Sequence, residues 1–359
     1  MGHFCTNIDY QTPSVLNMQN TGNHQQSNQG KAKPKTWNYH PQLPVTVSPL
    51  FITPLKIGAI IKWFFLSWFP ISERLIILCI SVLCWLFFSP SVEQTQTFEW
   101  GWVVQIYLRN LLLMIMVAGG LHCYLYVFRK QGDELQYDTK PFAQNKSSFT
   151  FNNQVWDNIF WSCASGVTIW TAYEALMLWS FSNGYSPQVA GPFSTLWLIG
   201  IIFFIPIWET FYFYLIHRLL HVPVLYKFAH SLHHRNTNVG PWSGFSMHPF
   251  EHLIYLASVL IHFLIPSHPL LIIFHLQFYA LSAATTHTGF AGLLAGDKKW
   301  IDLGTFHHQL HHRYFECNFG ALEIPWDKWF GSFHDGTEPS HQAFMQRRRE
   351  QVRAAHKSR

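Results

Sequence analysis

The stretch His217-Arg218-Leu219-Leu220-His221, with His230-Ser231-Leu232-His233-His234 shortly after it, determines how this chain is interpreted. A third cluster, His307-His308-Gln309-Leu310-His311-His312, lies much further along the chain. On an α-helix, residues three and four apart share a face, so each cluster would present its imidazoles as one row. Neutral imidazole is a common ligand of iron, zinc and copper. The spacing therefore predicts one metal site, and we expect it to be binuclear because its eight imidazole nitrogens exceed what one ion can bind.

The composition indicates a membrane protein. The 359 residues are 49% hydrophobic and only 12% charged, whereas a soluble domain has about 25% charged residues. The net charge of +5 comes from scattered basic residues without a recognition motif, so we expect no nucleic-acid partner. The six cysteines show no pairing pattern, which favours buried thiols over disulfides.

Apolar stretches at residues 75–89, 100–128, 155–181 and 196–216 are long enough to cross, or nearly cross, a hydrocarbon core of about 30 Å. Residues 50–70 contain lysines and prolines and predict a helix at the membrane interface. Residues 253–284 are broken by Pro266-Ser267-His268-Pro269 and predict a short helical hairpin. The expected fold is all-α: a polytopic integral membrane protein with about four transmembrane helices, this hairpin and a cytosolic histidine-rich cap.

The distribution of Lys and Arg predicts the orientation. Neither the segment between the first two spans nor residues 182–195 contain a basic residue, whereas the segment after the second span contains Arg129, Lys130, Lys140 and Lys146. The positive-inside rule therefore places both termini and the first two clusters in the cytosol. The hairpin would return the third cluster to the same side, so all three could form one cytosolic active site.

Further candidates lie between and before the clusters. His248 and His252 are four residues apart and His287 follows the hairpin, so we expect His252 and His287 to be additional ligands and His248 to orient a ligand through its second nitrogen. Glu209 lies within the fourth span, where an ionisable group is usually functional. We interpret it as a hydrogen-bond partner of a ligand imidazole, or alternatively as an ion-pair partner of Arg109. The remaining lone histidines, His40, His262, His268, His275 and His334, are interpreted as solvated or interfacial polar residues.

The three clusters resemble the histidine boxes of the sterol desaturase and fatty acid hydroxylase superfamily. The surroundings match too: Trp208-Glu209-Thr210-Phe211-Tyr212 precedes the first box, and Asn318-Phe319-Gly320 and Trp326-Asp327-Lys328-Trp329-Phe330-Gly331 follow the third. The resemblance covers residues 195–335. His248-Pro249-Phe250-Glu251 and His287-Thr288-Gly289 resemble elements of the C4-methylsterol oxidase and sterol C5-desaturase branches. One departure is Ala283, where fatty acid 2-hydroxylases have a further histidine.

The resemblance implies an enzyme that uses two iron ions and O2 to hydroxylate or desaturate a lipid, of the sterol or fatty-acyl and sphingolipid type, at an unactivated C–H bond. Electrons would come from a separate cytochrome b5 or ferredoxin type carrier. The protein would lie in the endoplasmic reticulum of a eukaryote or the inner membrane of a bacterium. We expect Glu209 to be catalytic. The expected metal ligands are His217, His221, His230, His233, His234, His252, His287, His308, His311 and His312.

The expected organisation has four parts: a disordered polar tail (1–50), an interfacial helix with transmembrane helices (51–190), the catalytic domain (191–340) and a basic C-terminal tail (341–359). Two other functions stay open, a histidine-rich metal-ion transporter and a non-catalytic lipid-binding relative. Hydroxylation and desaturation also both stay open, because they share an oxidant and differ in the position of the substrate.

Overall fold

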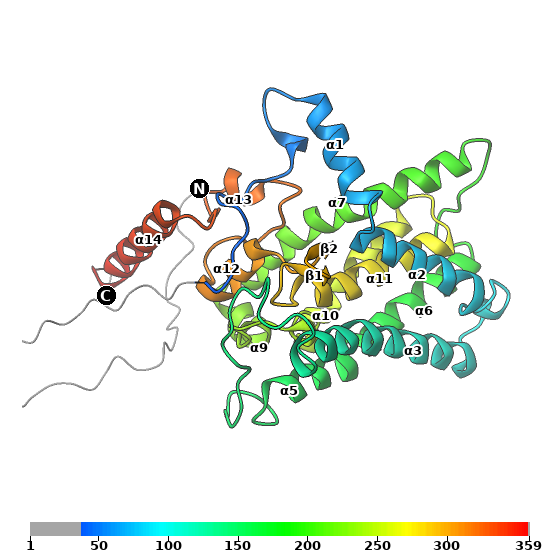
Figure 1. Cartoon of the computed structure of the whole chain (residues 1–359). Helices are drawn as coiled ribbons and strands as arrows, with labels where there is room; N and C mark the ends of the chain where they lie inside the picture. The colour runs from blue at the N-terminus through cyan, green and yellow to red at the C-terminus, as the bar shows by residue number, and fades with distance from the viewer. Residues whose placement is uncertain (1–36, 358–359) are drawn as a thin grey trace, which may run out of the picture.

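The computed structural model describes residues 37–357, which are almost entirely helical (Figure 1). The first half contains α1 (Ile57–Trp68), α2 (Glu73–Phe87), α3 (Trp100–Met114), α4 (Gly120–His122), α5 (Gln154–Phe160) and α6 (Thr168–Ser182). The second half contains α7 (Ser194–Leu220), α8 (Pro223–Leu225), α9 (Ser231–His234), α10 (Pro249–Leu256), α11 (Pro269–Thr286), α12 (Phe306–Tyr314), α13 (Trp326–Trp329) and α14 (Glu338–Lys357). Turns of 3-10 geometry are η1 (Pro49–Phe51), η2 (Gln94–Gln96), η7 (Pro241–Ser243) and η8 (Ala257–Phe263). Turns of π geometry are η3 (Ile115–Gly119), η4 (Cys123–Val127), η5 (Trp161–Val167) and η6 (Tyr226–His230).

Within residues 37–357, three helices are long and apolar enough to cross a membrane: Trp100–Val127, Ser194–Leu220 and Pro269–Thr286. The pair α1 and α2 qualifies together as a fourth span, bent by 50° at the break between them. The prediction of a polytopic, helical membrane protein is thus confirmed, although the set of spans differs. The predicted span at 155–181 is helical but is not among the four candidates. The arm at 269–286, which we expected to be too short, is among them.

Helix α11 forms the centre of the fold. Fifteen of its 18 residues are buried, and it packs against α2, α6 and α7. A helix that is apolar all round is stable only inside other helices, which explains why this one is enclosed. Figure 1 shows it running through the interior towards α12. The C-terminal end of this buried helix therefore lies close to the third histidine cluster.

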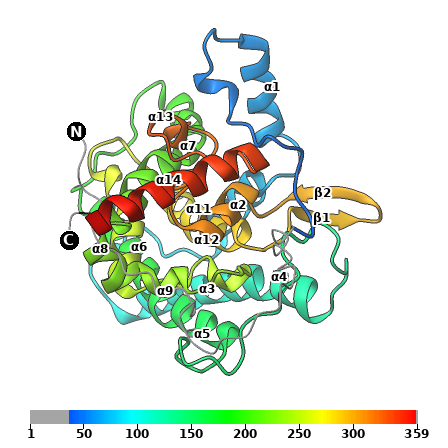
Figure 2. The same ribbon diagram turned by 90° about the vertical axis from the view of Figure 1, so that its left-hand side faces the viewer.

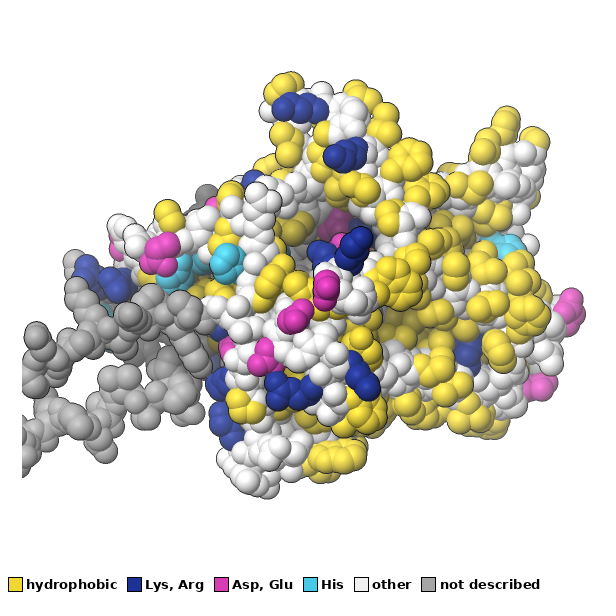
Figure 3. Space-filling view, viewed as in Figure 1, with side chains coloured by type: hydrophobic (Ala, Val, Ile, Leu, Met, Phe, Trp, Pro, Cys, Tyr) yellow, Lys and Arg dark blue, Asp and Glu magenta, His cyan; other side chains and the backbone are white. Residues whose placement is uncertain are grey.

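The outer helices present an apolar surface. Large hydrophobic side chains are exposed along α3, among them Leu108 and Leu112, and along α7, among them Leu215 and Leu219. Figure 3 shows hydrophobic side chains covering most of the right half of the molecule, whereas basic side chains gather towards the left. A contiguous apolar surface of this extent is typical of contact with lipid.

Polar groups within the helical core pair with one another. Arg109 forms a buried ion pair with Glu174, so the alternative pairing of Arg109 with Glu209 is wrong. His262 Nε2 lies 3.0 Å from His275 Nδ1, and His275 Nε2 lies 2.9 Å from the Ser258 hydroxyl. The interpretation of His262 and His275 as solvated residues is therefore also wrong, because both are fully enclosed between η8 and α11.

Two peripheral segments pack on the histidine-rich end. Residues 37–50, which we predicted to be part of a disordered tail, are ordered: Trp37 packs edge-on against Phe306 with ring centroids 5.0 Å apart, and Val45 N–H bonds the Asp335 carbonyl. Residues 1–36 of that tail lie outside the described residues. The predicted basic tail from residue 341 is the helix α14, which crosses in front of α12 in Figure 2 and contacts Tyr314.

A β-hairpin that the sequence did not lead us to expect connects α11 to α12. Strand β1 (Gly292–Ala295) pairs antiparallel with β2 (Lys298–Asp302), and Gly296 in the turn has a φ of +60°, which only glycine adopts without strain. The hairpin projects from the body in Figure 2. It returns the chain so that α12 begins beside the end of α11.

Candidate metal centre

Helix ends bring the histidine clusters together. His217 lies in the last turn of α7 and His221 caps that helix. His230 closes the π turn η6, and α9 carries the doublet His233-His234. A π turn inserts an extra residue into a helix and so shifts the direction of the side chains that follow, which is common at functional sites. His287 caps α11, and His308, His311 and His312 lie on α12.

Nine of these imidazoles form two groups, and within each group the ring nitrogens lie within 4.8 Å of one another. Group A consists of His217, His221, His230, His234 and His311. Group B consists of His233, His287, His308 and His312. The groups adjoin, with the rings of His234 and His312 centred 4.9 Å apart. The arrangement can hold two metal ions side by side.

The histidine doublets explain the division. Adjacent residues on a helix project about 100° apart, so two neighbouring imidazoles cannot point at one centre. His233 accordingly enters group B and His234 group A, while His312 enters group B and His311 group A. Both doublets therefore serve both groups.

The distances between nitrogens fit metal coordination. His234 Nε2 lies 3.1 Å from His221 Nε2 and 3.0 Å from His311 Nε2. In group B, His287 Nε2 lies 3.0 Å from His308 Nε2 and 3.1 Å from His312 Nε2. Two nitrogens bound about 2.1 Å from one ion at right angles are about 3.0 Å apart. The same nitrogens thus converge as ligands would.

The second nitrogen of most of these rings is held by the protein, which leaves Nε2 to face the centre. Nδ1 of His217 lies 2.6 Å from the Phe319 carbonyl and Nδ1 of His311 lies 2.7 Å from that of Cys317. In group B, His287 Nδ1 lies 2.8 Å from the Ala283 carbonyl. A ring that donates through Nδ1–H carries its lone pair on Nε2. His217 Nε2 and His230 Nε2 are buried without any protein partner, as expected of ligand atoms.

Burial keeps the imidazoles neutral. It lowers the pKa of His230 to about 3, of His233 to about 4 and of His287 to about 3. Burial also lowers the pKa of His234 and His312 well below the usual value. A neutral ring can donate its lone pair to a metal ion, so the site is ready to bind one at neutral pH.

Four of the sequence candidates lie outside both groups. His252 has each ring nitrogen in a hydrogen bond, with the Ser165 hydroxyl at 3.0 Å and the Phe245 carbonyl at 3.1 Å, and our ligand set omits it. His248 is the N-cap of α10, where its Nδ1 accepts from Phe250 N–H. His307 lies 3.9 Å from Asp327. Glu209 lies in the wall of a cavity, and no ion pair joins it to any residue of the described chain.

The carboxylate that orients an imidazole of group A is Glu251, which sequence reasoning missed. Its Oε1 lies 2.8 Å from His230 Nδ1, and both side chains are buried. A carboxylate that accepts from a ligand imidazole fixes the orientation of the ring and raises its basicity. The sequence signal for Glu251 is His248-Pro249-Phe250-Glu251. In this stretch the orienting role was predicted for His248.

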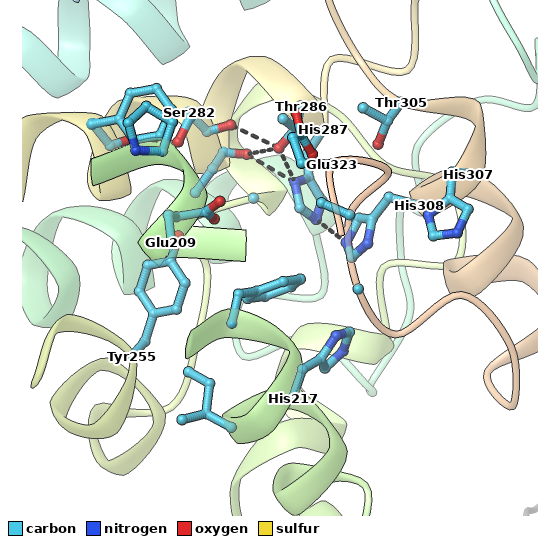
Figure 4. Close-up of a pocket in the computed structure, with 18 of the residues that line it drawn as sticks. Glu209, His217, Tyr255, Ser282, Thr286, His287, Thr305, His307, His308 and Glu323 are labelled. Carbon is cyan, nitrogen blue, oxygen red and sulfur yellow. Dashed lines mark hydrogen bonds between the residues drawn. The ribbon is translucent and has the colours of Figure 1, made fainter. Parts of the chain in front are cut away.

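A cavity of about 210 Å³ adjoins both groups (Figure 4). His217 and His230 of group A and His233, His287 and His308 of group B are among its lining residues. Apolar side chains, including Phe213 and Phe278, form other parts of the wall. A cavity that combines apolar walls with convergent polar groups is suited to bind a small molecule.

The family model and the similar known proteins point to the same kind of enzyme. The fatty acid hydroxylase family model matches residues 202–332. The Delta(7)-sterol 5(6)-desaturase of Eremothecium gossypii is 32% identical over 146 residues, which are 40% of this chain and 39% of that protein. The Delta(7)-sterol-C5(6)-desaturase of Nicotiana tabacum is 26% identical over 253 residues, 66% of this chain and 85% of that protein. The Delta(7)-sterol 5(6)-desaturase of Saccharomyces cerevisiae is 30% identical over 125 residues, 33% of this chain and 32% of that protein.

The chain thus spans less than half the length of the two fungal relatives. No solved structure is significantly similar to it. The family match contains every histidine of both groups, and the resemblance seen in the histidine boxes is confirmed. Residues 202–332, which contain both histidine groups, are therefore the part of the chain that matches the sterol desaturase and fatty acid hydroxylase superfamily.

Proposed function

We propose that this protein is an O2-dependent di-iron oxidoreductase of membranes that desaturates or hydroxylates a lipid, most closely in the manner of the sterol desaturases among its relatives. Nine neutral imidazoles suit iron, zinc and copper alike, and the superfamily selects iron. The observation that carries the proposal is a cavity lined by histidines of both groups. A substrate bound there would lie beside both ions.

Bound iron would supply the activation of O2 that removal of hydrogen from an unactivated C–H bond requires. Desaturation takes two hydrogen atoms from the lipid, and with two electrons and two protons from outside the lipid it reduces O2 to two molecules of water. Hydroxylation inserts one oxygen atom and forms one water with the same two electrons. The electrons require a separate donor, for which we propose a carrier of the cytochrome b5 or ferredoxin type.

The side chains around the cavity would position the substrate and the ligands. Glu251 holds His230 in place, and the Ala283 carbonyl holds His287. Phe213 and Phe278 would exclude water from the reacting carbon and limit its movement. Correct positioning of this kind separates desaturation from hydroxylation, because the second hydrogen must lie within reach before oxygen is transferred.

The placement of the ligands favours this function over metal transport. Transporters bind ions near the membrane midplane on broken helices. Here His217 and His221 lie at the C-terminal end of α7 and His287 at that of α11. We propose that these ends and both chain termini face the cytosol, in the endoplasmic reticulum if the host is a eukaryote, in accordance with the distribution of basic residues.

Measurement of iron and of O2 uptake on purified protein tests the proposal. We expect two irons per chain and lipid-dependent uptake of O2 when a reductant is present. His234→Ala and His312→Ala should each lose both properties while the protein still accumulates in membranes. The control is His40→Ala, an exposed histidine that belongs to neither group, which should behave as wild type. Normal turnover in His234→Ala and His312→Ala would refute the metal assignment.

A further inference from the structure

The cavity beside the metal centre contains a carboxyl group that the metal site does not use. Four glutamates line the cavity: Glu73, Glu209, Glu251 and Glu323. Three of them have strong partners within the protein. Thr285 donates to Glu73, His230 lies against Glu251, and Arg74 forms an ion pair with Glu323 at 2.6 Å.

Glu209 is the exception among these carboxyl groups. No Lys or Arg of the described chain lies within ion-pair distance of it, and the hydroxyl of Thr210, its neighbour on α7, donates to the Pro206 carbonyl. A carboxyl group has two oxygens and about four positions that accept hydrogen bonds, so most of its capacity is unused. Figure 4 shows its oxygens pointing into the cavity from the wall opposite the labelled histidines. An acceptor that is directed into a cavity and lacks a strong partner within the protein is suited to a donor on the ligand.

The charge of the lining restricts the chemistry of that donor. Among the lining residues in the described chain, Arg74 is the one Lys or Arg, and Glu323 already neutralises it. A free carboxylate or a phosphate on the substrate would meet glutamates without a free cation. A neutral hydroxyl group, in contrast, can donate to Glu209 without adding charge to the cavity.

We propose that Glu209 binds a hydroxyl group of the lipid substrate and so selects lipid alcohols over lipid acids. The inference rests on the proposed function, because it takes the cavity as the substrate site. Glu209 would act by fixing which carbon of the bound lipid faces the histidines, since one anchored end sets the position of the rest of a rigid molecule. This role replaces the one that the sequence suggested for Glu209, which was a hydrogen bond to an imidazole that binds metal.

Binding measurements on the purified, iron-loaded full chain without reductant test this role. The probes are a Δ7-sterol, its deoxy counterpart and its methyl ether, which retains the oxygen but cannot donate. Wild type should bind the alcohol about tenfold to a hundredfold more tightly than the other two, the range for leaving a buried polar group without its partner. Glu209→Leu should bind all three equally well, and Glu209→Gln should keep a reduced preference because its amide oxygen still accepts.

Glu323→Gln is the matched control, since this carboxylate lines the same cavity but is paired with Arg74. It should keep the preference for the alcohol. The assignment is overturned if both Glu209 variants keep the full preference for the alcohol, or if Glu323→Gln loses that preference to the same extent as Glu209→Leu. Tighter binding of the corresponding amine than of the alcohol by wild type would also overturn it. Iron content and O2 uptake are measured on the same preparations. Wild-type protein without bound iron or without O2 uptake would refute the proposed function, whereas the binding preference tests the role of Glu209 alone.

Discussion

Replacement of Gly244 by alanine should disable the metal centre through one added methyl group. A Cβ at this position would lie 1.8 Å from the Ala283 carbonyl oxygen and 2.9 Å from His287 Nδ1. Contacts of a Cβ below 3.0 Å essentially never occur, so the oxygen and the new carbon must separate by about 1.2 Å. The Ala283 oxygen also accepts the hydrogen bond from His287. Metal–ligand distances tolerate only about 0.2 Å, so a shift of this size should remove His287 from group B.

The backbone of Gly244 has a φ of −63°, which alanine adopts freely, so the effect would come from the clash alone. Overpacking of this kind costs about 1–3 kcal/mol, and most of the protein should still fold and insert. We expect iron, measured by mass spectrometry on purified protein, to fall from two per chain to one or fewer, with loss of O2 uptake. Gly200→Ala on α7 is the control, because no atom lies within 4 Å of its Cβ. A Gly244→Ala protein with two irons and normal turnover would contradict the geometric argument.

Three further perturbations test other parts of the structure. Glu251→Gln should keep the fold but weaken iron binding about tenfold to a hundredfold, measured by chelator competition; unchanged affinity would mean that His230 does not depend on this carboxylate. Trp37→Ala should destabilise the histidine-rich end by about 1–3 kcal/mol, seen as earlier thermal unfolding, whereas an unchanged midpoint would show that the N-terminal segment is dispensable. Single cysteines at the exposed positions Gln144 and Gln188 should react with an impermeant thiol reagent from opposite sides of the membrane, Gln144 from the cytosol; labelling of both from one side would refute the orientation.

The sequence predicted those parts of the centre that depend on local spacing. Histidines three and four residues apart share a helix face wherever the helix lies, so eight of the nine grouped histidines follow from three short clusters. His287 was also anticipated, because it follows an apolar arm that must return to the site. The assignment of individual ligands to two groups was not predictable before the relative orientation of α9 and α12 was known.

The roles of residues that depend on distant partners could not be predicted from the sequence. Both His252 and His287 are predicted from the sequence to bind metal, but the ring of His252 is occupied by Ser165 and the Phe245 carbonyl, and Ser165 is remote in sequence. Glu174, the partner of Arg109, likewise lies 65 residues away on another helix. The polar composition of residues 1–50 concealed Trp37, which packs on Phe306 near the other end of the chain.

The division of each histidine doublet between the two groups would affect how the protein acquires the proposed iron ions. One short piece of backbone in α9, and another in α12, carries a ligand for each ion. An ion captured in group A fixes both backbones and so prearranges His233 and His312 for the second ion, which then loses less entropy on binding. Such coupling is reciprocal. Titration of the iron-free protein should therefore pass from the empty to the fully loaded form with little of the one-iron species at any point, and a chelator should strip both ions together.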